Sequence, residues 1–466
     1  MLFNSNEFLV FFALFCLGFG LAQRSLQLRN ILVVVASYVF YGWWDYRFTA
    51  LLLFTSLLDF SVALLMDGTG NEVRRRALLV TSLVSNLGVL GLFKYFNFFR
   101  DSLDSLLASF GGGVHGGGLN IILPVGISFY TFQSMSYVID VYRRQMPASR
   151  NPIRFLAYVS FFPQLLAGPI GRGTHLLPQF SRTLRITAAE VELGLWLVVW
   201  GFFKKVVLAD NLAPLVELVY QNTTTSGPTI VLGTMAFGLQ IYCDFSGYCD
   251  IACGLARLLG FELALNFNLP YFATSLREFW HKWHISLSTW LRDYLYISLG
   301  GSRRAEARTC LNLGITMLLG GLWHGAALTF VLWGLLHGLG LIADRLWEQH
   351  RPGPLALPGW LGWLATQAFV LYGWLLFRAT SLDQVLAFTG ALGHLSLPRW
   401  WLTYAANLLF LASPLLLMQI WQWRSGRLDA PMKLTRSWRA ALQGVMLVLI
   451  VCFWEPEAVP FIYFQF

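Results

Sequence analysis

The stretch TCLNLGITMLLGGLWHGAALTFVLWGLLHGLGLIA, residues 309–343, decides the fold class of this chain. It contains no Asp, Glu, Lys or Arg. As one straight helix it would be roughly 50 Å long, whereas the hydrocarbon core of a bilayer is about 30 Å thick. The stretch therefore predicts membrane-embedded helix with a bend, and Gly320, Gly321 and Gly325 are the places where a bend is expected.

Similar apolar runs recur along the 466 residues, of which 56% are hydrophobic and 12% are charged. Soluble globular proteins carry about 25% charged residues. The further spans are expected near 7–22, 30–44, 48–66, 77–97, 119–141, 190–208, 228–243, 360–378, 401–421 and 440–455. The segment 155–171 contains Pro163, Gly168 and Pro169, which favour a re-entrant or broken element. We therefore expect an all-α polytopic membrane protein, a single integral-membrane domain over residues 1–466 with about 11 spans plus re-entrant elements.

The net charge of +9 is distributed as membrane topology requires and does not indicate nucleic acid binding. Basic residues form short clusters between apolar runs, at 24–29, 74–76, 143–154 and 424–439, as is typical of cytoplasmic loops. No Lys or Arg precedes the first apolar run, so that run is expected to remain as a helix rather than be cleaved. The alternation predicts that both the N-terminus and the C-terminus lie on the periplasmic side.

His324 is the first candidate for chemistry, sixteen residues after Arg308 and twenty before Asp344. An ionisable residue at membrane depth is costly and indicates function by default. Histidine also titrates near neutrality, so it can take up a proton and return it. The alternative is a structural histidine that hydrogen-bonds across helices, but a functional role in proton transfer is favoured.

Glu278, His281 and His284 would share one face if they lay on a helix. A carboxylate and two histidines at this spacing are able to hold iron or zinc. A second helix of the same kind is missing, and a helix rich in Trp, Lys and His at the membrane surface is the simpler interpretation. No metal is therefore predicted.

Two further polar groups are open to more than one interpretation. Asp244 and Asp250 follow a predicted span; Arg257 is a partner for either in an ion pair that orders a broken helix, and a catalytic role is the alternative. Arg292, Arg303 and Arg304 are able to hold phosphate groups, although a positive-inside cluster is the favoured interpretation of them.

Five blocks carry a resemblance to a known family. They run in one order from about residue 120 to 340: GISFYTF (126–132), FPQLLAGPI (162–170), YCDFSG (242–247), FWHKWHISLS with WLRDY (279–288 and 290–294), and LWHG (322–325). With these blocks the chain resembles the membrane-bound O-acyltransferases. Its ending PFIYFQF (460–466) resembles the bacterial branch that includes alginate O-acetyltransferase.

The resemblance implies a ring of helices around a central funnel in the bacterial inner membrane, surrounded by lipid. It implies that His324 matches the family's essential histidine and His284 the second signature position. It also implies acetyl-CoA as a cytoplasmic acyl donor without a bound cofactor, an exopolysaccharide acceptor, and a periplasmic acetyltransferase as partner protein. Relatives usually have a basic residue at His281, so a metal role for it gains no support.

The hypothesis that follows is acetyl transfer to hydroxyls of alginate, cellulose or a similar exported polymer. His324 would act as general base, with the Gly325 amide, the Trp323 indole or His284 as hydrogen-bond donors to the oxyanion. Arg292, Arg303 and Arg304 would hold the donor's phosphates. D-alanyl transfer and peptidoglycan O-acylation are alternatives. A proton-coupled transporter using Asp244, Asp250 and His324 is an alternative of another class, weakened by the lack of internal repeats. A membrane di-metal oxidase is a third.

Overall fold

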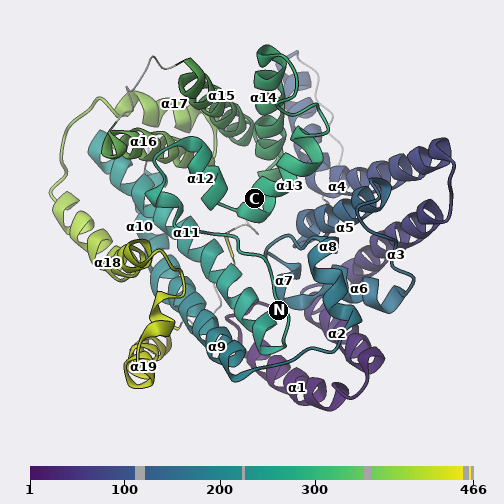
Figure 1. The fold of residues 1–466 in the computed structure, drawn as a ribbon. Coiled ribbons are helices and arrows are strands. Elements are labelled where there is room, and N and C mark those ends of the chain that lie inside the picture. The colour runs from purple at the N-terminus through teal and green to yellow at the C-terminus, as the bar shows by residue number, and fades with distance from the viewer. Residues whose placement is uncertain (111–120, 223–225, 351–357, 455–460, 463–466) are drawn as a thin grey trace. The chain divides into compact units, whose positions relative to one another are not determined.

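The computed structural model describes residues 1–110, 121–222, 226–350, 358–454 and 461–462. All regular secondary structure in these residues is helical, which confirms the all-α prediction (Figure 1). Six of the described helices are long and apolar enough to cross a membrane: α3 (Arg47–Asp67), α4 (Glu72–Ser109), α11 (Gly227–Leu258), α15 (Leu328–His350), α16 (Gly359–Arg378) and α18 (Trp401–Ser425). The chain is thus a multi-pass membrane protein, and the larger number of spans and the single domain stay predictions. Most of the ending at 460–466 lies outside the described residues.

The chain divides into two compact units. Unit 1 comprises Met1–Thr187 and Ala256–Ala264, and unit 2 comprises Ala188–Leu255 and Leu265–Phe466. The helices of unit 1 are α1 (Asn6–Ala22), α2 (Leu26–Gly42), α3, α4, α5 (Ile127–Tyr142), α6 (Pro152–Ser160), α7 (Phe162–Leu165) and α8 (Gly173–Leu176).

In unit 1, α5 is buried along nearly its whole length and packs against α3 and α4. The broken element predicted at 155–171 is present: α6 ends at Ser160 and α7 begins at Phe162. Pro163 lies in the first turn of α7, where its missing N–H group costs no hydrogen bond.

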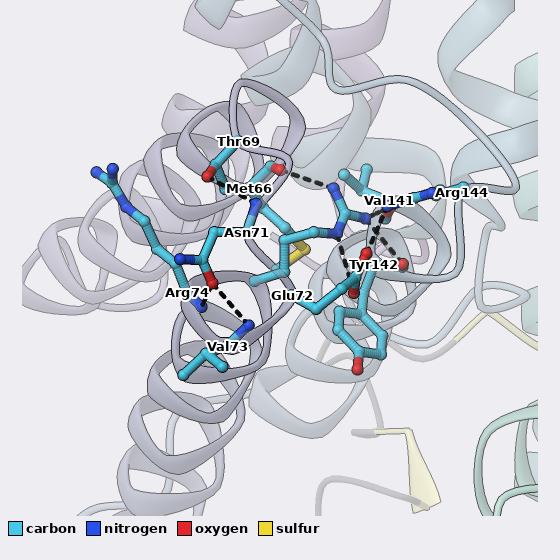
Figure 2. A network of polar contacts seen from close by, with 10 residues as sticks. Met66, Thr69, Asn71, Glu72, Val73, Arg74, Val141, Tyr142 and Arg144 are labelled. Carbon is cyan, nitrogen blue, oxygen red and sulfur yellow. Dashed lines mark hydrogen bonds and ion pairs between the residues drawn. The ribbon is translucent and has the colours of Figure 1, made fainter.

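A polar network joins the ends of α3, α4 and α5 (Figure 2). Asn71 caps α4 by accepting hydrogen bonds from the backbone N–H groups of Val73 and Arg74. The Arg75 guanidinium is only 4% exposed and donates to the carbonyls of Met66 at 2.7 Å and Tyr142 at 2.9 Å. The basic cluster at 74–76 was predicted to mark a cytoplasmic loop. In the structure Arg75, its middle residue, also holds the ends of α3, α4 and α5 together.

Unit 2 contains the remaining helices. The first of these are α9 (Ala188–Phe202), the π-helical segment η2 (Phe203–Ala209), α10 (Asp210–Tyr220) and most of α11. Then come α12 (Leu276–Lys282), α13 (Ile285–Trp290), the π-helical segment η4 (Leu291–Tyr296), α14 (Glu306–His324), α15, α16, α17 (Leu382–Ala391), α18 and α19 (Arg436–Cys452). The span expected at 228–243 is longer than predicted, because α11 continues unbroken to Leu258.

The apolar stretch 309–343 forms most of a hairpin of two helices, α14 and α15, which lie side by side (Figure 1). The predicted bend falls at Gly325, whose extended backbone follows the last residue of α14. The two helices approach closely through glycines: a Cβ atom on Gly334 would lie 2.6 Å from the Met317 carbonyl oxygen. Small residues let membrane helices pack at short range, so the glycine pattern explains how one apolar run folds back on itself.

Candidate active site

His324 is the last residue of α14 and lies among aromatic rings from three helices. It is 5% exposed. Its imidazole meets Trp333 of α15 edge-on, with 5.0 Å between ring centroids, and Phe377 of α16 at 5.2 Å. A side chain on Gly325 would overlap the Phe330 ring. The position of His324 therefore depends on the closed packing of the α14–α15 turn.

His284 lies in the short connection between α12 and α13 and is fully buried. Its backbone is left-handed, with φ 44° and ψ 53°, which is uncommon for a residue other than glycine. The ring packs edge-on against Phe245 of α11 at 4.6 Å. Burial lowers the pKa of His284 to about 3, so the imidazole is neutral near neutral pH.

Trp323 connects the two histidines. Its ring centroid is 6.0 Å from that of His284 and 5.1 Å from that of His324. Four residues predicted to take part in the chemistry, His284, Trp323, His324 and Gly325, thus lie together in unit 2 although forty positions separate the histidines. Such a buried group is suited to moving a proton away from water.

A cavity of about 630 Å³ is lined by residues of α12, α13, α14 and α15. Its polar lining includes Arg277, His281, Arg292 and Arg345, and its apolar lining includes Leu313 and Met317 of α14. Trp280 also lines the cavity, and its ring is 5.7 Å from that of Trp333. Trp280 therefore lies between the cavity and Trp333, which packs against His324; neither His284 nor His324 is among the residues that line the cavity.

The three predicted donor-binding arginines are not equivalent. Arg292 lines the cavity, and its Nε atom donates to Asp293 at 2.7 Å. Arg303 and Arg304 are exposed in the turn before α14 and are not among the residues that line this cavity. Of the three, Arg292 is the one that lines this cavity.

The idea that Glu278, His281 and His284 share one helix face is wrong. Helix α12 ends at Lys282, and His284 follows in the left-handed conformation. The Glu278 carboxylate instead pairs with Lys282 at 2.7 Å. In the described ranges no group of three or more His, Cys, Asp or Glu side chains is arranged to hold a metal ion.

The partner proposed for Asp244 and Asp250 is also wrong. Asp250 pairs with Lys204 at 2.7 Å, and Asp244 pairs with Lys205 at 2.7 Å; both lysines lie in η2. The guanidinium of Arg257 lies 3.8 Å from Glu262. A signal was available, because Lys204 and Lys205 lie inside the apolar run 190–208, where charged residues are expensive unless they are paired.

One site residue, Asn266, was missed entirely. It is 2% exposed, and its Oδ1 atom lies 3.2 Å from His284 Nδ1. It stands eighteen residues before His284 in a segment without regular structure, so neither spacing nor periodicity links the two.

The comparisons with known proteins show the family of the chain. The chain matches the pattern of the membrane-bound O-acyltransferase family over residues 141–382, and it belongs to that family. It is therefore a membrane O-acyltransferase, which favours acyl transfer over the transporter and oxidase alternatives.

Particular relatives narrow the comparison. The chain is similar to the Probable alginate O-acetylase AlgI of Pseudomonas aeruginosa, with 45% identity over 82% of this chain and 73% of the relative. It is 43% identical to the protein of the same name from Azotobacter vinelandii, over 82% of this chain and 76% of the relative. It is 34% identical to the Peptidoglycan O-acetyltransferase of Helicobacter pylori, over 83% of this chain and 78% of the relative.

Proposed function

We propose that this O-acyltransferase transfers acetyl groups from acetyl-CoA toward hydroxyls of an exported polysaccharide of the alginate type or cellulose. The proposal is supported by the relatives named alginate O-acetylase, at 45% and 43% identity over most of the chain. The observation that carries it is the buried cluster of His284, Trp323 and His324.

In the proposed reaction His324 acts as the general base. It takes the proton of an acceptor hydroxyl while the hydroxyl oxygen attacks the carbonyl carbon of the acetyl thioester. The carbonyl oxygen becomes an oxyanion, for which the Gly325 amide and the Trp323 indole are the proposed donors. The C–S bond then breaks, and the imidazolium returns the proton to the thiolate. A base of this kind contributes roughly 10²–10⁴-fold to the rate.

The proposed donor site is the cavity beside α12 and α13. Its basic residues, Arg292 among them, suit the phosphates of acetyl-CoA, and its apolar wall suits the uncharged arm. Arg303 and Arg304 would add positive charge before α14. Whether the acceptor hydroxyl reaches this depth or an acyl group is held briefly on the protein can be decided by trapping radiolabelled acetyl on the chain, with and without His324.

Three parts of the proposal concern the surroundings of the site. The family resemblance supports one membrane domain, a ring of helices around a funnel, in the bacterial inner membrane. The alternating basic clusters support periplasmic N- and C-termini. A periplasmic acetyltransferase is the proposed partner protein, because acetyl-CoA and the exported polymer are on opposite sides of the membrane.

The test is the variant His324→Ala in cells that make the acetylated polymer. Acetylation should be lost, by roughly 10²-fold or more, because the hydroxyl is a weak nucleophile without a base. The matched control is His337→Gln, which changes another buried histidine next to Trp333 and should keep most of the acetylation. Acetylation that persists in His324→Ala, at normal amounts of the protein in the membrane, would contradict the proposal.

A second acceptor has a specific observation behind it, the 34% identity to the Peptidoglycan O-acetyltransferase of Helicobacter pylori. D-alanyl transfer remains a further alternative within the family. The mass added to the polysaccharide and to the peptidoglycan, compared between cells with and without this chain, separates acetyl from D-alanyl and one polymer from the other.

A further inference from the structure

The side-chain amide of Asn266 has only one orientation that its surroundings accept. One of its two terminal atoms lies 3.1 Å from the backbone nitrogen of Ser286, which is a donor and has no lone pair to offer. This terminal atom must therefore be the oxygen, Oδ1, and it also accepts from the Ser286 hydroxyl at 2.9 Å. The amide nitrogen then faces the Cys249 sulfur at 3.1 Å.

This orientation determines where the proton of His284 lies. The same Oδ1 atom is 3.2 Å from His284 Nδ1, and a carbonyl oxygen only accepts hydrogen bonds. Nδ1 must therefore carry the hydrogen. A neutral imidazole has one N–H group, so Nε2 holds the lone pair. The complete burial of the ring keeps it neutral.

Asn266 also holds the strained backbone around His284. Its carbonyl accepts from the backbone N–H of Ile285 at 2.9 Å, directly after the left-handed residue. On the other side, the Asn268 N–H donates to the Lys282 carbonyl at 2.9 Å. The short segment 266–268 therefore binds the chain both before and after His284, and the Asn266 side chain binds the ring between these points.

We infer that Asn266 is a positioning residue that keeps His284 protonated at Nδ1, so that Nε2 of His284 serves the reaction only as a hydrogen-bond acceptor. The inference rests on the proposed function, since it assigns His284 its part in that reaction. A group that meets this nitrogen in the reaction must donate a hydrogen bond to it, and a second hydroxyl of a polysaccharide acceptor is a donor of that kind. His284 is then excluded as a donor to the oxyanion, which leaves that role to the Trp323 indole and the Gly325 amide.

The tautomer is measured directly by nitrogen-15 NMR of the full-length protein labelled only at histidine, in detergent at neutral pH. The signals of His284 are those lost in His284→Gln. We expect a protonated Nδ1 and an unprotonated Nε2 in the wild type and in the control Cys249→Ala, which keeps the amide oxygen in place. In Asn266→Leu the two tautomers should mix. The opposite tautomer in the wild type, or an unchanged tautomer in Asn266→Leu, would overturn the inference.

A conservative variant separates positioning from mere packing. In Asn266→Asp a carboxylate still accepts from Nδ1–H but adds negative charge, so His284 should gain its second proton at a higher pH than in the wild type. Acetylation should fall roughly tenfold or more in Asn266→Leu and be largely retained at high pH in Asn266→Asp. Equal losses in both variants, or no shift in the titration of His284, would contradict the inference.

The two proposals fail in different ways. Acetylation that survives His324→Ala would remove the proposed function, whereas the NMR signals of His284 would be unaffected by that result. A reversed tautomer together with an inactive His324→Ala variant would remove only the role assigned to Asn266.

Discussion

At the scale of single residues, the site combines two buried histidines with different surroundings. His324 is the last residue of α14, and its ring packs edge-on against Trp333 and Phe377. His284 has a left-handed backbone and a hydrogen-bonded Nδ1. Strained backbone is held in place only where the surrounding structure requires it, and it often marks functional positions. The strain and the hydrogen bond together distinguish His284 from an ordinary packing residue.

Burial of His284 predicts that stability falls in mild acid. Its pKa is about 3 in the folded protein and about 6.5 in the unfolded chain, so the unfolded chain binds more protons between these values. Stability is therefore lost progressively as the pH falls from 6.5 toward 3, because in this range only the unfolded chain binds a proton at His284. The apparent melting temperature in detergent, measured between about pH 7 and 4.5, should decrease less in His284→Gln than in the wild type. The exposed control His175→Gln should behave like the wild type; identical pH dependence of all three would refute this prediction.

At the scale of elements, helix ends and close helix contacts position the site. Gly334 of α15 lies directly against the Met317 carbonyl of α14, so the two helices pack closely. His324 is the last residue of α14. The pairs Lys204–Asp250 and Lys205–Asp244 join η2 to α11, which also carries Phe245 against His284. Buried charges of this kind are tolerated only as pairs, because either one alone would be left unsolvated.

The α14–α15 contact predicts different effects for two glycines of the same hairpin. In Gly334→Ala the new Cβ would lie 2.6 Å from the Met317 carbonyl oxygen and 3.1 Å from Leu318 Cα, so the helices must separate. We expect a destabilisation of roughly 1–3 kcal/mol and a loss of acetylation, because His324 moves away from Trp333. Gly314→Ala meets nothing closer than Ile342 at 3.9 Å and should be tolerated. Thermal unfolding and polymer acetylation check both; equal tolerance of the two changes would show that the close contact does not matter.

At the scale of the whole molecule, the proposed reaction needs a defined topology, since the donor and the polymer are on opposite sides of the membrane. The first predicted loop has two basic residues, Arg24 and Arg29, which the positive-inside rule assigns to the cytoplasm, although the structure places Arg29 inside α2. Arg29 is 1% exposed and hydrogen-bonds to the carbonyls of Gln179 and Arg182 within unit 1. One of the two charges used for the topology is therefore also a structural residue.

The topology predicts opposite labelling at the two ends of the first helix. In a variant without its own cysteines, Asn6→Cys should react with a membrane-impermeant thiol reagent added to intact spheroplasts. Gln27→Cys, exposed at the start of α2, should react only after the membrane is permeabilised. The reverse pattern would place the N-terminus in the cytoplasm and refute the proposed orientation.

Much of the fold could be predicted from local sequence. The helical class, the Pro163 break and the bend at Gly325 depend on neighbouring residues, and the structure confirms all three. Helix α11 is longer than predicted, because Asp244 and Asp250 are paired with buried lysines and so do not end the span. Of the candidate site, His324 could be proposed from its depth, because residues 309–343 contain no Asp, Glu, Lys or Arg, and the resemblance of the surrounding blocks singled it out as the general base.

The sequence by itself determined the membrane class, the helical fold and the candidate histidine. Hydropathy, and the helix breaks that proline and glycine cause, depend only on residues close together in the chain. Only the tertiary structure decided which groups pair: Lys204 with Asp250, Arg75 with three helix ends, and Asn266 with His284. These pairings join segments that no periodicity relates. A buried polar group must find its partner wherever the fold brings one within hydrogen-bonding distance, and that distance is a property of the packed chain.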